Sequence, residues 1–247
     1  CEEELSERKL KEIYAPFNRN HDRCVVMDIK SAELTKYASN AMLATKISFM
    51  NELSQIAERV GADIENVRVG IGSDSRIGYS FIYPGIGYGG SCFPKDIKAL
   101  SKTSKDYGYE SKILEAVKKV NKEQRKSFID KIVKHFKGSL SGLTLGIWGL
   151  SFKPKTDDIR EAPSVEVINS LLDLGAKIKA YDPMAMENFK DLNHKSSGMT
   201  FHKTKYSVLK DSDALIILTE WKDFWNPDFN KITELLKSPV IFDGRNL

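Results

Sequence analysis

The residues best suited to chemistry are one cysteine and the glycine-rich loop that leads to it. The segment 85–96 has the sequence GIGYGGSCFPKD, in which four of the first six residues are glycine and Cys92 is the second residue after them. Glycine lets a backbone approach a ligand closely and adopt positive φ. Pro94 is well placed as the first residue of a helix, so the Cys92 thiol would lie beside a helix N-terminus. The partial positive charge there and the charge of Lys95 both favour a thiolate.

The residues alone leave two interpretations of this loop open. Cys92 can be a nucleophile, or the loop can be a tight structural turn that carries a small, apolar and inert cysteine. A thiol hydrolase is a more distant alternative, because no histidine stands in a recognisable pairing with Cys92. The four histidines, at positions 21, 135, 194 and 202, are all expected on the surface.

Composition limits the classes of protein to consider. The 247 residues are 41% hydrophobic and 29% charged, enough for one large or two smaller cores. The net charge of +4 comes from interspersed lysines without a basic block, which suits an anionic small molecule better than nucleic acid. No signal peptide and no apolar run of about eighteen residues is present, so we expect no membrane partner. Three cysteines without metal-ligand spacing or a disulfide framework predict no metal site and a cytoplasmic location.

Helical patterns dominate the first part of the chain. The strongest spans about residues 31–60, with Asp28 or Ser31 available as a cap and Gly61 as a terminator. Its apolar positions cover more than one face, so this helix needs two packing partners, which gives a physical motive for a homodimer. The remaining predicted elements here are helices at 2–14, 63–72, 94–107 and 110–136 and a short strand at 24–27.

The last hundred residues alternate strand and helix. We expect strands at 143–150, 177–181, 214–218 and 240–242 and helices at 163–174, 205–211 and 228–237. This alternation is typical of a parallel, doubly wound sheet. No GxGxxG follows the first strand, so an ordinary dinucleotide site is not expected here. The predicted fold class is therefore α/β, with an all-helical region followed by a Rossmann-like domain.

A longer match around Cys92 extends these inferences. The segment 81–96, FIYPGIGYGGSCFPKD, resembles the active-site signature of the UDP-glucose 6-dehydrogenases within the UDP-glucose/GDP-mannose dehydrogenase family. Residues 35–40 and 46–52 resemble the family's central helix, and residues 149–164 resemble its carboxy-terminal UDP-binding signature. The resemblance implies three parts: 1–28 as the tail of an amino-terminal NAD-binding domain, 29–137 as a helical central dimerisation domain, and 138–247 as a UDP-sugar-binding domain.

The resemblance also implies site residues, although each alone would pass for an ordinary solvated side chain. Catalytic roles fall to Cys92 as nucleophile, to Lys36 and Asn40 as donors to a developing oxyanion, and to Asp96, which would position or activate water. Lys95 and Arg160 would contact NAD. Substrate contacts are implied for Arg76, which reaches the site of a neighbouring subunit, and for Phe81, Ile82, Tyr83, Pro84, Gly85, Gly89, Lys153 and Arg245.

The implied activity is the NAD-dependent, four-electron oxidation of UDP-glucose to UDP-glucuronate, a step in making nucleotide-sugar and polysaccharide precursors. A thiohemiacetal and then a thioester on Cys92 would retain the aldehyde between the two hydride transfers. Because most of the NAD-binding domain lies outside these 247 residues, we expect this fragment alone to be inactive. Two alternatives stay open: a UDP-sugar-binding and dimerisation module without turnover, and a related dehydrogenase for another nucleotide-sugar.

Overall fold

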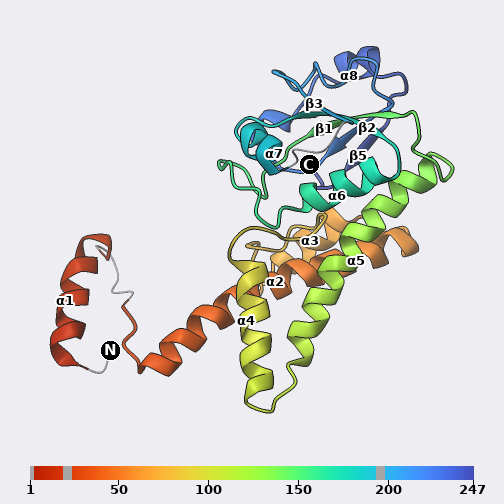
Figure 1. Cartoon of the computed structure of the whole chain (residues 1–247). Helices are drawn as coiled ribbons and strands as arrows, with labels where there is room; N and C mark the ends of the chain where they lie inside the picture. Colours follow the sequence, from red (N-terminus) through yellow and green to blue (C-terminus); the bar gives the residue numbers. More distant parts are fainter. Residues whose placement is uncertain (1–2, 19–23, 193–197) are drawn as a thin grey trace.

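The computed structural model describes residues 3–18, 24–192 and 198–247, and combines a helical region with a parallel sheet (Figure 1). The α-helices are α1 Glu4–Tyr14, α2 Ile29–Val60, α3 Ile64–Gly72, α4 Phe93–Asp106, α5 Lys112–His135, α6 Pro163–Asp173, α7 Met186–Leu192 and α8 Phe229–Leu235. The strands are β1 Thr144–Trp148, β2 Lys177–Tyr181, β3 Met199–Phe201, β4 Ala214–Ile217 and β5 Ile241–Asp243. None of the helices in the described ranges is long and apolar enough to cross a membrane.

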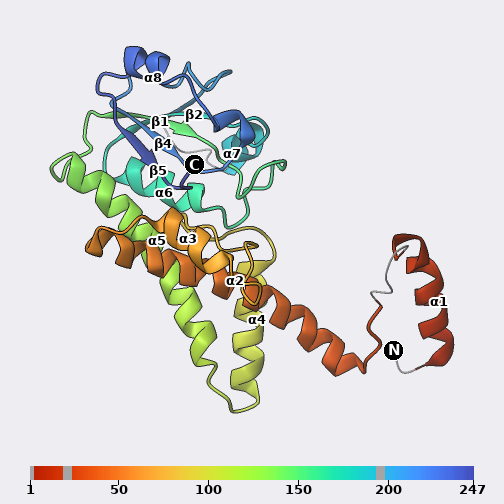
Figure 2. The ribbon, with the colours of Figure 1, turned by 180° about the vertical axis from the view of Figure 1, so that it is seen from behind.

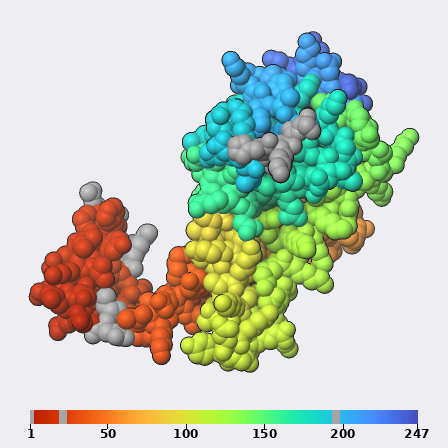
Figure 3. Space-filling view, in the orientation of Figure 1, coloured from red at the N-terminus to blue at the C-terminus, as the bar shows by residue number. Residues whose placement is uncertain are grey.

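Helix α2 is the scaffold of the helical region, and its predicted ends are confirmed. The Asp28 carboxylate accepts a hydrogen bond of 2.9 Å from the Ser31 amide, and Gly61 ends the helix with φ 73°. The middle of α2 packs on α4 and α5 through Ala41, Ala44 and residues they contact. The first turns of α2 project from this body, and α1, which buries no residue, lies beyond them (Figures 1 and 3).

The sheet has the order β3-β2-β1-β4-β5, and all four strand pairs are parallel. The Rossmann-like part of the predicted fold is therefore confirmed. The buried faces of β1 and β4 explain why their apolar runs were visible in the sequence.

Four local predictions were wrong. Residues 205–211 form turns instead of a helix, and residues 24–27 belong to no strand. The prediction also missed β3 and α7. Strand β3 has three residues and pairs only with β2 at the sheet edge, so its sequence has little room for a periodic pattern.

Helix α5 runs through both parts of the molecule (Figures 1 and 2). Val117, in its first half, belongs to the core of the helical region. Phe128 and Ile132, in its second half, belong to the same core as Leu145 and Ile147 of β1. The sheet is therefore packed on a helix that the helical region also needs, although the expected boundary at 138 lies after that helix.

Candidate active site

Cys92 lies where the glycine-rich loop enters α4. It is the N-cap residue of that helix, its side chain is exposed, and its Sγ lies 3.7 Å from the Ser91 Oγ. Pro94 is the second residue of α4, so the predicted helix start is confirmed to within one residue. The thiol is thus accessible to a ligand and lies at the positive end of the helix.

The sheet domain packs directly on the loop before Cys92. The Gly90 amide donates a hydrogen bond of 3.0 Å to the Arg160 carbonyl. At Gly89, a Cβ atom would overlap the carbonyl oxygen of Glu161. At Gly90, where φ is +87°, a Cβ atom would lie 2.6 Å from the Phe152 ring. These two glycines therefore have a packing role, as the structural interpretation of the loop requires, in addition to any role in binding.

Asp96 collects the other predicted catalytic residues around one buried carboxylate. Its Oδ2 accepts a hydrogen bond of 2.5 Å from the Asn40 Nδ2 and lies 3.4 Å from the Lys36 Nζ. Its Oδ1 lies 3.4 Å from the Lys95 Nζ. Lys36 and Asn40 are four residues apart on α2 and so share a face, as expected from their spacing.

The surroundings of Asp96 determine its charge state. The side chain of Asp96 is 5% exposed, whereas that of Lys36 is 65% exposed. Burial acts to raise the pKa of the Asp96 carboxyl, but the hydrogen bond from Asn40, the charge of Lys95 and the contact with Lys36 outweigh it and hold the pKa below its ordinary value. Asp96 is therefore a carboxylate at neutral pH, and it orients an amide and an ammonium group near Cys92.

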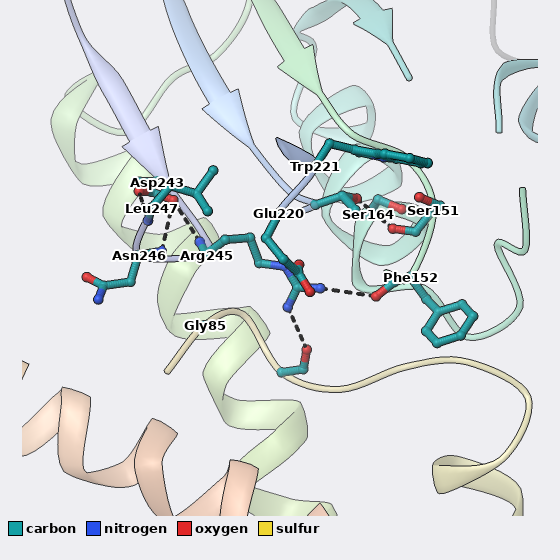
Figure 4. Close-up of polar contacts among 12 residues, drawn as sticks. Gly85, Ser151, Phe152, Ser164, Glu220, Trp221, Asp243, Arg245, Asn246 and Leu247 are labelled. Atoms are coloured by element: carbon teal, nitrogen blue, oxygen red, sulfur yellow. Dashed lines mark hydrogen bonds and ion pairs between the residues drawn. The ribbon is translucent and has the colours of Figure 1, made fainter. Parts of the chain in front are cut away.

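Arg245 follows β5 and bridges the loop and the sheet domain (Figure 4). Its Nη1 donates to the Gly87 carbonyl at 3.4 Å and its Nη2 to the Phe152 carbonyl at 3.1 Å. Its Nε lies 2.7 Å from the Glu220 Oε2. The predicted substrate residue is thus held at the loop by internal partners, with its side chain 13% exposed.

Two further cations, Lys153 and Arg160, lie on the segment between β1 and α6. The hydrogen bond to the Asp158 carboxylate raises the pKa of Arg160, and the charges of Asp158 and Cys92 add to this effect. The Arg160 side chain is exposed despite this pairing. The Lys153 Nζ lies 5.2 Å from the centre of the Phe152 ring and is exposed.

The remaining predicted substrate residues differ in their surroundings. Arg76 pairs with Asp74 at 2.6 Å, and its side chain is 87% exposed. Its turn contacts α2 through Lys46, whose Nζ donates to the Ile77 carbonyl at 3.1 Å, so it lies further along α2 than Asn40. Within this chain Arg76 is therefore separate from the Asp96 cluster.

The run of residues before the loop alternates between exposed and buried side chains. Ile82 and Pro84 are buried, whereas Phe81 and Tyr83 are exposed. Phe81 has φ 61°, and the Arg68 guanidinium lies 4.5 Å from the centre of the Tyr83 ring. The exposed rings leave aromatic surface beside the loop for another molecule.

Sequence reasoning missed the polar residues that hold the loop from the helical side. The Asn51 Oδ1 accepts a 2.8 Å hydrogen bond from the Gly85 amide. The Gln124 Nε2 donates to the Gly85 carbonyl, also at 2.8 Å. The available signal was a polar residue on the inward face of a long helix, which is a weak one because such residues also occur on exposed faces.

Sequence reasoning also missed Asp182, which follows β2. This carboxylate has no exposed surface and accepts hydrogen bonds from the Leu150 and Ser151 amides at 2.7 and 3.1 Å. It also accepts from the Ser151 hydroxyl, the Trp221 indole and the amides of Met184 and Ala185. These donors satisfy the buried charge. The Leu150 and Ser151 amides of the turn after β1, which could otherwise bind a dinucleotide phosphate, are already used by Asp182.

The lowered pKa of Asp96 predicts a pH-dependent contribution to stability. A carboxyl whose pKa is lower in the folded chain stabilises the fold above its ordinary pKa of 3.8, and this stabilisation is lost as the pH falls through the folded value. Asp96→Asn should therefore lower the free energy of unfolding by about 1–3 kcal/mol near neutral pH, and by less in acid. Urea unfolding at several pH values measures this difference. Asp106→Asn, exposed on the same helix, is the control; a loss at Asp96 that does not shrink in acid would contradict the prediction.

Comparisons with known proteins agree with this architecture. Residues 30–123 match the family model for the central domain of the UDP-glucose/GDP-mannose dehydrogenase family, and residues 146–247 match the model for its UDP binding domain. The chain is 46% identical over 241 residues to a UDP-glucose 6-dehydrogenase of Pseudomonas aeruginosa, an alignment that covers 96% of this chain and 53% of the relative. The chain thus spans about half the length of the curated relatives it matches.

Solved structures give the same result. A UDP-glucose dehydrogenase from Pyrobaculum islandicum matches with a TM-score of 0.87 and 37% identity, over 99% of this chain and 54% of that one. A GDP-mannose dehydrogenase from Pseudomonas aeruginosa matches with a TM-score of 0.54 and 28% identity, over 98% of this chain and 56% of that one. The two family matches together extend over both the helical region and the sheet. The chain therefore belongs to the UDP-glucose/GDP-mannose dehydrogenase family.

Proposed function

We propose that this chain is the substrate-binding and covalent-catalysis part of an NAD-dependent UDP-glucose 6-dehydrogenase. The observation that carries the proposal is the cluster of Lys36, Asn40 and Asp96 beside an exposed cysteine at a helix N-terminus. The similarity to relatives that carry this activity supports the same conclusion. Oxidation of a primary alcohol to a carboxylate removes four electrons, so the aldehyde stage has to be retained between two oxidations. An accessible thiol can retain it as a covalent adduct.

In this proposal, the chain's own residues form the covalent intermediate, stabilise its negative charge and release the product. The Cys92 Sγ adds to the aldehyde carbon and forms a thiohemiacetal, whose oxidation gives a thioester. Lys36 and Asn40 donate to the oxygen that carries negative charge in each tetrahedral stage. Asp96 holds these donors and orients the water that releases UDP-glucuronate from Cys92.

The residues near Cys92 fit NAD, which would accept the hydride in each oxidation. Lys95 and Arg160 are both exposed cations that flank the loop and helix end carrying Cys92. They suit the anionic diphosphate of a dinucleotide that approaches from outside the described chain. The turn after β1 does not fit a dinucleotide phosphate, because its Leu150 and Ser151 amides already donate to the Asp182 carboxylate. We therefore propose that residues outside this chain hold most of the cofactor.

The nucleotide-sugar would bind between the exposed aromatic surface at Phe81 and Tyr83 and the cations of the sheet domain. Lys153 is exposed and available for a diphosphate. Arg245 is already paired with Glu220, so its guanidinium is preoriented at the loop carbonyl of Gly87. The two alternatives, a binding module without turnover and a dehydrogenase for another nucleotide-sugar, differ in what they bind and whether they turn it over.

Ligand titration separates these alternatives. We expect UDP-glucose to bind this chain and to raise its thermal midpoint, and NAD not to bind it measurably. Calorimetric titration with each ligand, and with GDP-mannose and a UDP-N-acetylhexosamine as controls, measures both the binding and the sugar preference. Tighter binding of a control sugar would favour the related dehydrogenase, and tight binding of NAD alone would contradict our assignment of the sheet domain.

The covalent step is tested in a protein that also carries the amino-terminal domain of the family. Cys92→Ser should lower the rate of UDP-glucuronate release about 100-fold or more, because a serine hydroxyl is a much weaker nucleophile than a thiolate near neutral pH. Product formation by chromatography and trapping of the aldehyde measure the two halves of the reaction. Cys24→Ser is the matched control. Normal acid formation by the Cys92 variant would refute the nucleophile assignment.

We also propose that the chain forms a homodimer through α2. The helix exposes Met42, Phe49 and Ile56, which are spaced seven residues apart and so form one apolar stripe. A stripe of large exposed apolar side chains on a long helix is typical of an interface. The exposed turn at Arg76, which contacts α2 at Lys46, lies where a second subunit could receive its guanidinium.

The dimer proposal predicts the effect of one charge on this stripe. Phe49→Glu should weaken self-association about tenfold or more, because burying an unpaired carboxylate costs several kcal/mol. Sedimentation equilibrium at micromolar concentrations measures the dissociation constant. Tyr107→Glu, at an exposed position after α4, is the control. A wild-type chain that is monomeric under these conditions would overturn the proposal.

A further inference from the structure

Two residues of α5 hold the backbone of Tyr88, four residues before Cys92. The Asn121 Oδ1 accepts a hydrogen bond of 2.8 Å from the Tyr88 amide, and the Asn121 Nδ2 donates to the Tyr88 carbonyl at 3.2 Å. The Arg125 Nη2 donates to the same carbonyl at 2.6 Å. Asn121 and Arg125 are each 8% exposed and lie four residues apart on one helix face. The Asn121 side chain thus bonds both the N–H and the C=O of Tyr88, as a residue of a neighbouring β-strand would.

The Tyr88 side chain packs against the first residue of α4. Its ring is buried and meets the Phe93 ring edge-on, with centroids 6.0 Å apart. Burial raises the pKa of Tyr88 to about 12, although the charge of Arg125 acts against it, so the phenol is neutral at ordinary pH. Phe93 is the first residue of α4, directly after Cys92. Tyr88 is therefore fixed by its backbone on one side and packs beside the cysteine on the other.

Arg125 connects this restraint to the sheet domain. While one guanidinium nitrogen binds Tyr88, the Nη1 forms an ion pair of 2.7 Å with the Glu166 Oε2 in the first turn of α6. Helix α6 begins three residues after Arg160. The planar guanidinium of Arg125 thus bonds both the loop before Cys92 and the first turn of α6, the helix that directly follows the segment carrying Lys153 and Arg160.

The contacts at Tyr88 border a cavity. This space of about 410 Å³ is lined by Tyr88, Asn121, Arg125 and Glu166, among other residues. On the side of this cavity, the loop is held at Tyr88 by the hydrogen bonds from Asn121 and Arg125. Loss of either side chain would give the loop room to shift.

We propose that Asn121 and Arg125 are positioning residues, which hold Tyr88 so that the Cys92 thiol stays at the N-terminus of α4 and in register with the sheet domain. The inference rests on the proposed function for its catalytic meaning, since it deepens the role of the same cysteine. Neither residue touches the reacting atoms. Both act through the loop backbone.

The test measures the reactivity of Cys92 in the chain itself. Two variants are compared with wild type: Asn121→Leu, which keeps a similar shape but removes both hydrogen bonds, and Arg125→Lys, which keeps the charge but cannot bridge Tyr88 and Glu166 in the same way. Lys126→Gln, an exposed neighbour on α5, is the matched control. Alkylation by iodoacetamide at neutral pH is followed by peptide mass spectrometry, with Cys24 as the internal reference.

We expect both variants to slow alkylation of Cys92 about two- to fivefold relative to Cys24, which is the size of effect that a helix N-terminus has on a neighbouring charge. The Lys126 control should not change it. Alkylation is measured well below each variant's thermal midpoint, so that the rate is that of the folded protein. If Asn121→Leu does not fold, the Arg125→Lys result decides. An unchanged or faster rate at Cys92 in a folded variant would overturn the proposal.

Turnover gives a second, separable readout. In a protein with the amino-terminal domain, both variants should lower kcat more than they raise KM for UDP-glucose, because they displace the thiol and leave the exposed sugar contacts in place. The kcat is calculated per folded enzyme, because a fall in stability alone would also lower the apparent kcat without changing KM. If wild type shows no dehydrogenase turnover, the proposed function fails, while the alkylation result still decides whether Asn121 and Arg125 position Cys92.

Discussion

The rest of the site depends on how a buried loop satisfies its backbone. Residues 85–90 lie between the helical region and the sheet domain, where neither a helix nor a strand ladder supplies partners. An unpaired backbone group in such a place is costly. Asn51, Asn121 and Gln124 supply side-chain partners from the helices, and the backbones of Arg160 and Gly244 supply carbonyls from the sheet domain. The cysteine follows a loop whose course is set from both sides.

Two buried carboxylates show how the same chemical group serves different ends. Asp182 is enclosed and surrounded by neutral donors, so it fixes the turn after β1. Asp96 is equally hidden, but two of its partners are the exposed ammonium groups of Lys36 and Lys95. The Asp96 cluster therefore presents two exposed ammonium groups near the end of α4 that carries Cys92. Enclosure makes the first carboxylate structural, and open cationic partners make the second available for chemistry.

The sequence predicted the features that depend on local pattern or on contiguous motifs. The α2 helix with its Asp28 cap, the parallel sheet and the grouping of Lys36 and Asn40 could be inferred in this way. It could not predict β3, whose three residues carry too little pattern. It also wrongly indicated a helix at 205–211, where the structure has turns. Nor could it show that Asn121 meets Tyr88 or that Arg245 pairs with Glu220, because these contacts join residues far apart in the chain. Such pairings arise only when tertiary packing is complete.

The continuity of α5 has a mechanical consequence. Because one unbroken helix belongs to both cores, no loop lies between the part of α5 that packs in the helical region and the part that packs on the sheet. Residues 29–36 of α2, in contrast, are exposed and project from the body that these two cores form. Lys36 lies where this segment joins the body and contacts the Asp96 carboxylate, so the attachment of the projecting segment and the Asp96 cluster share one residue.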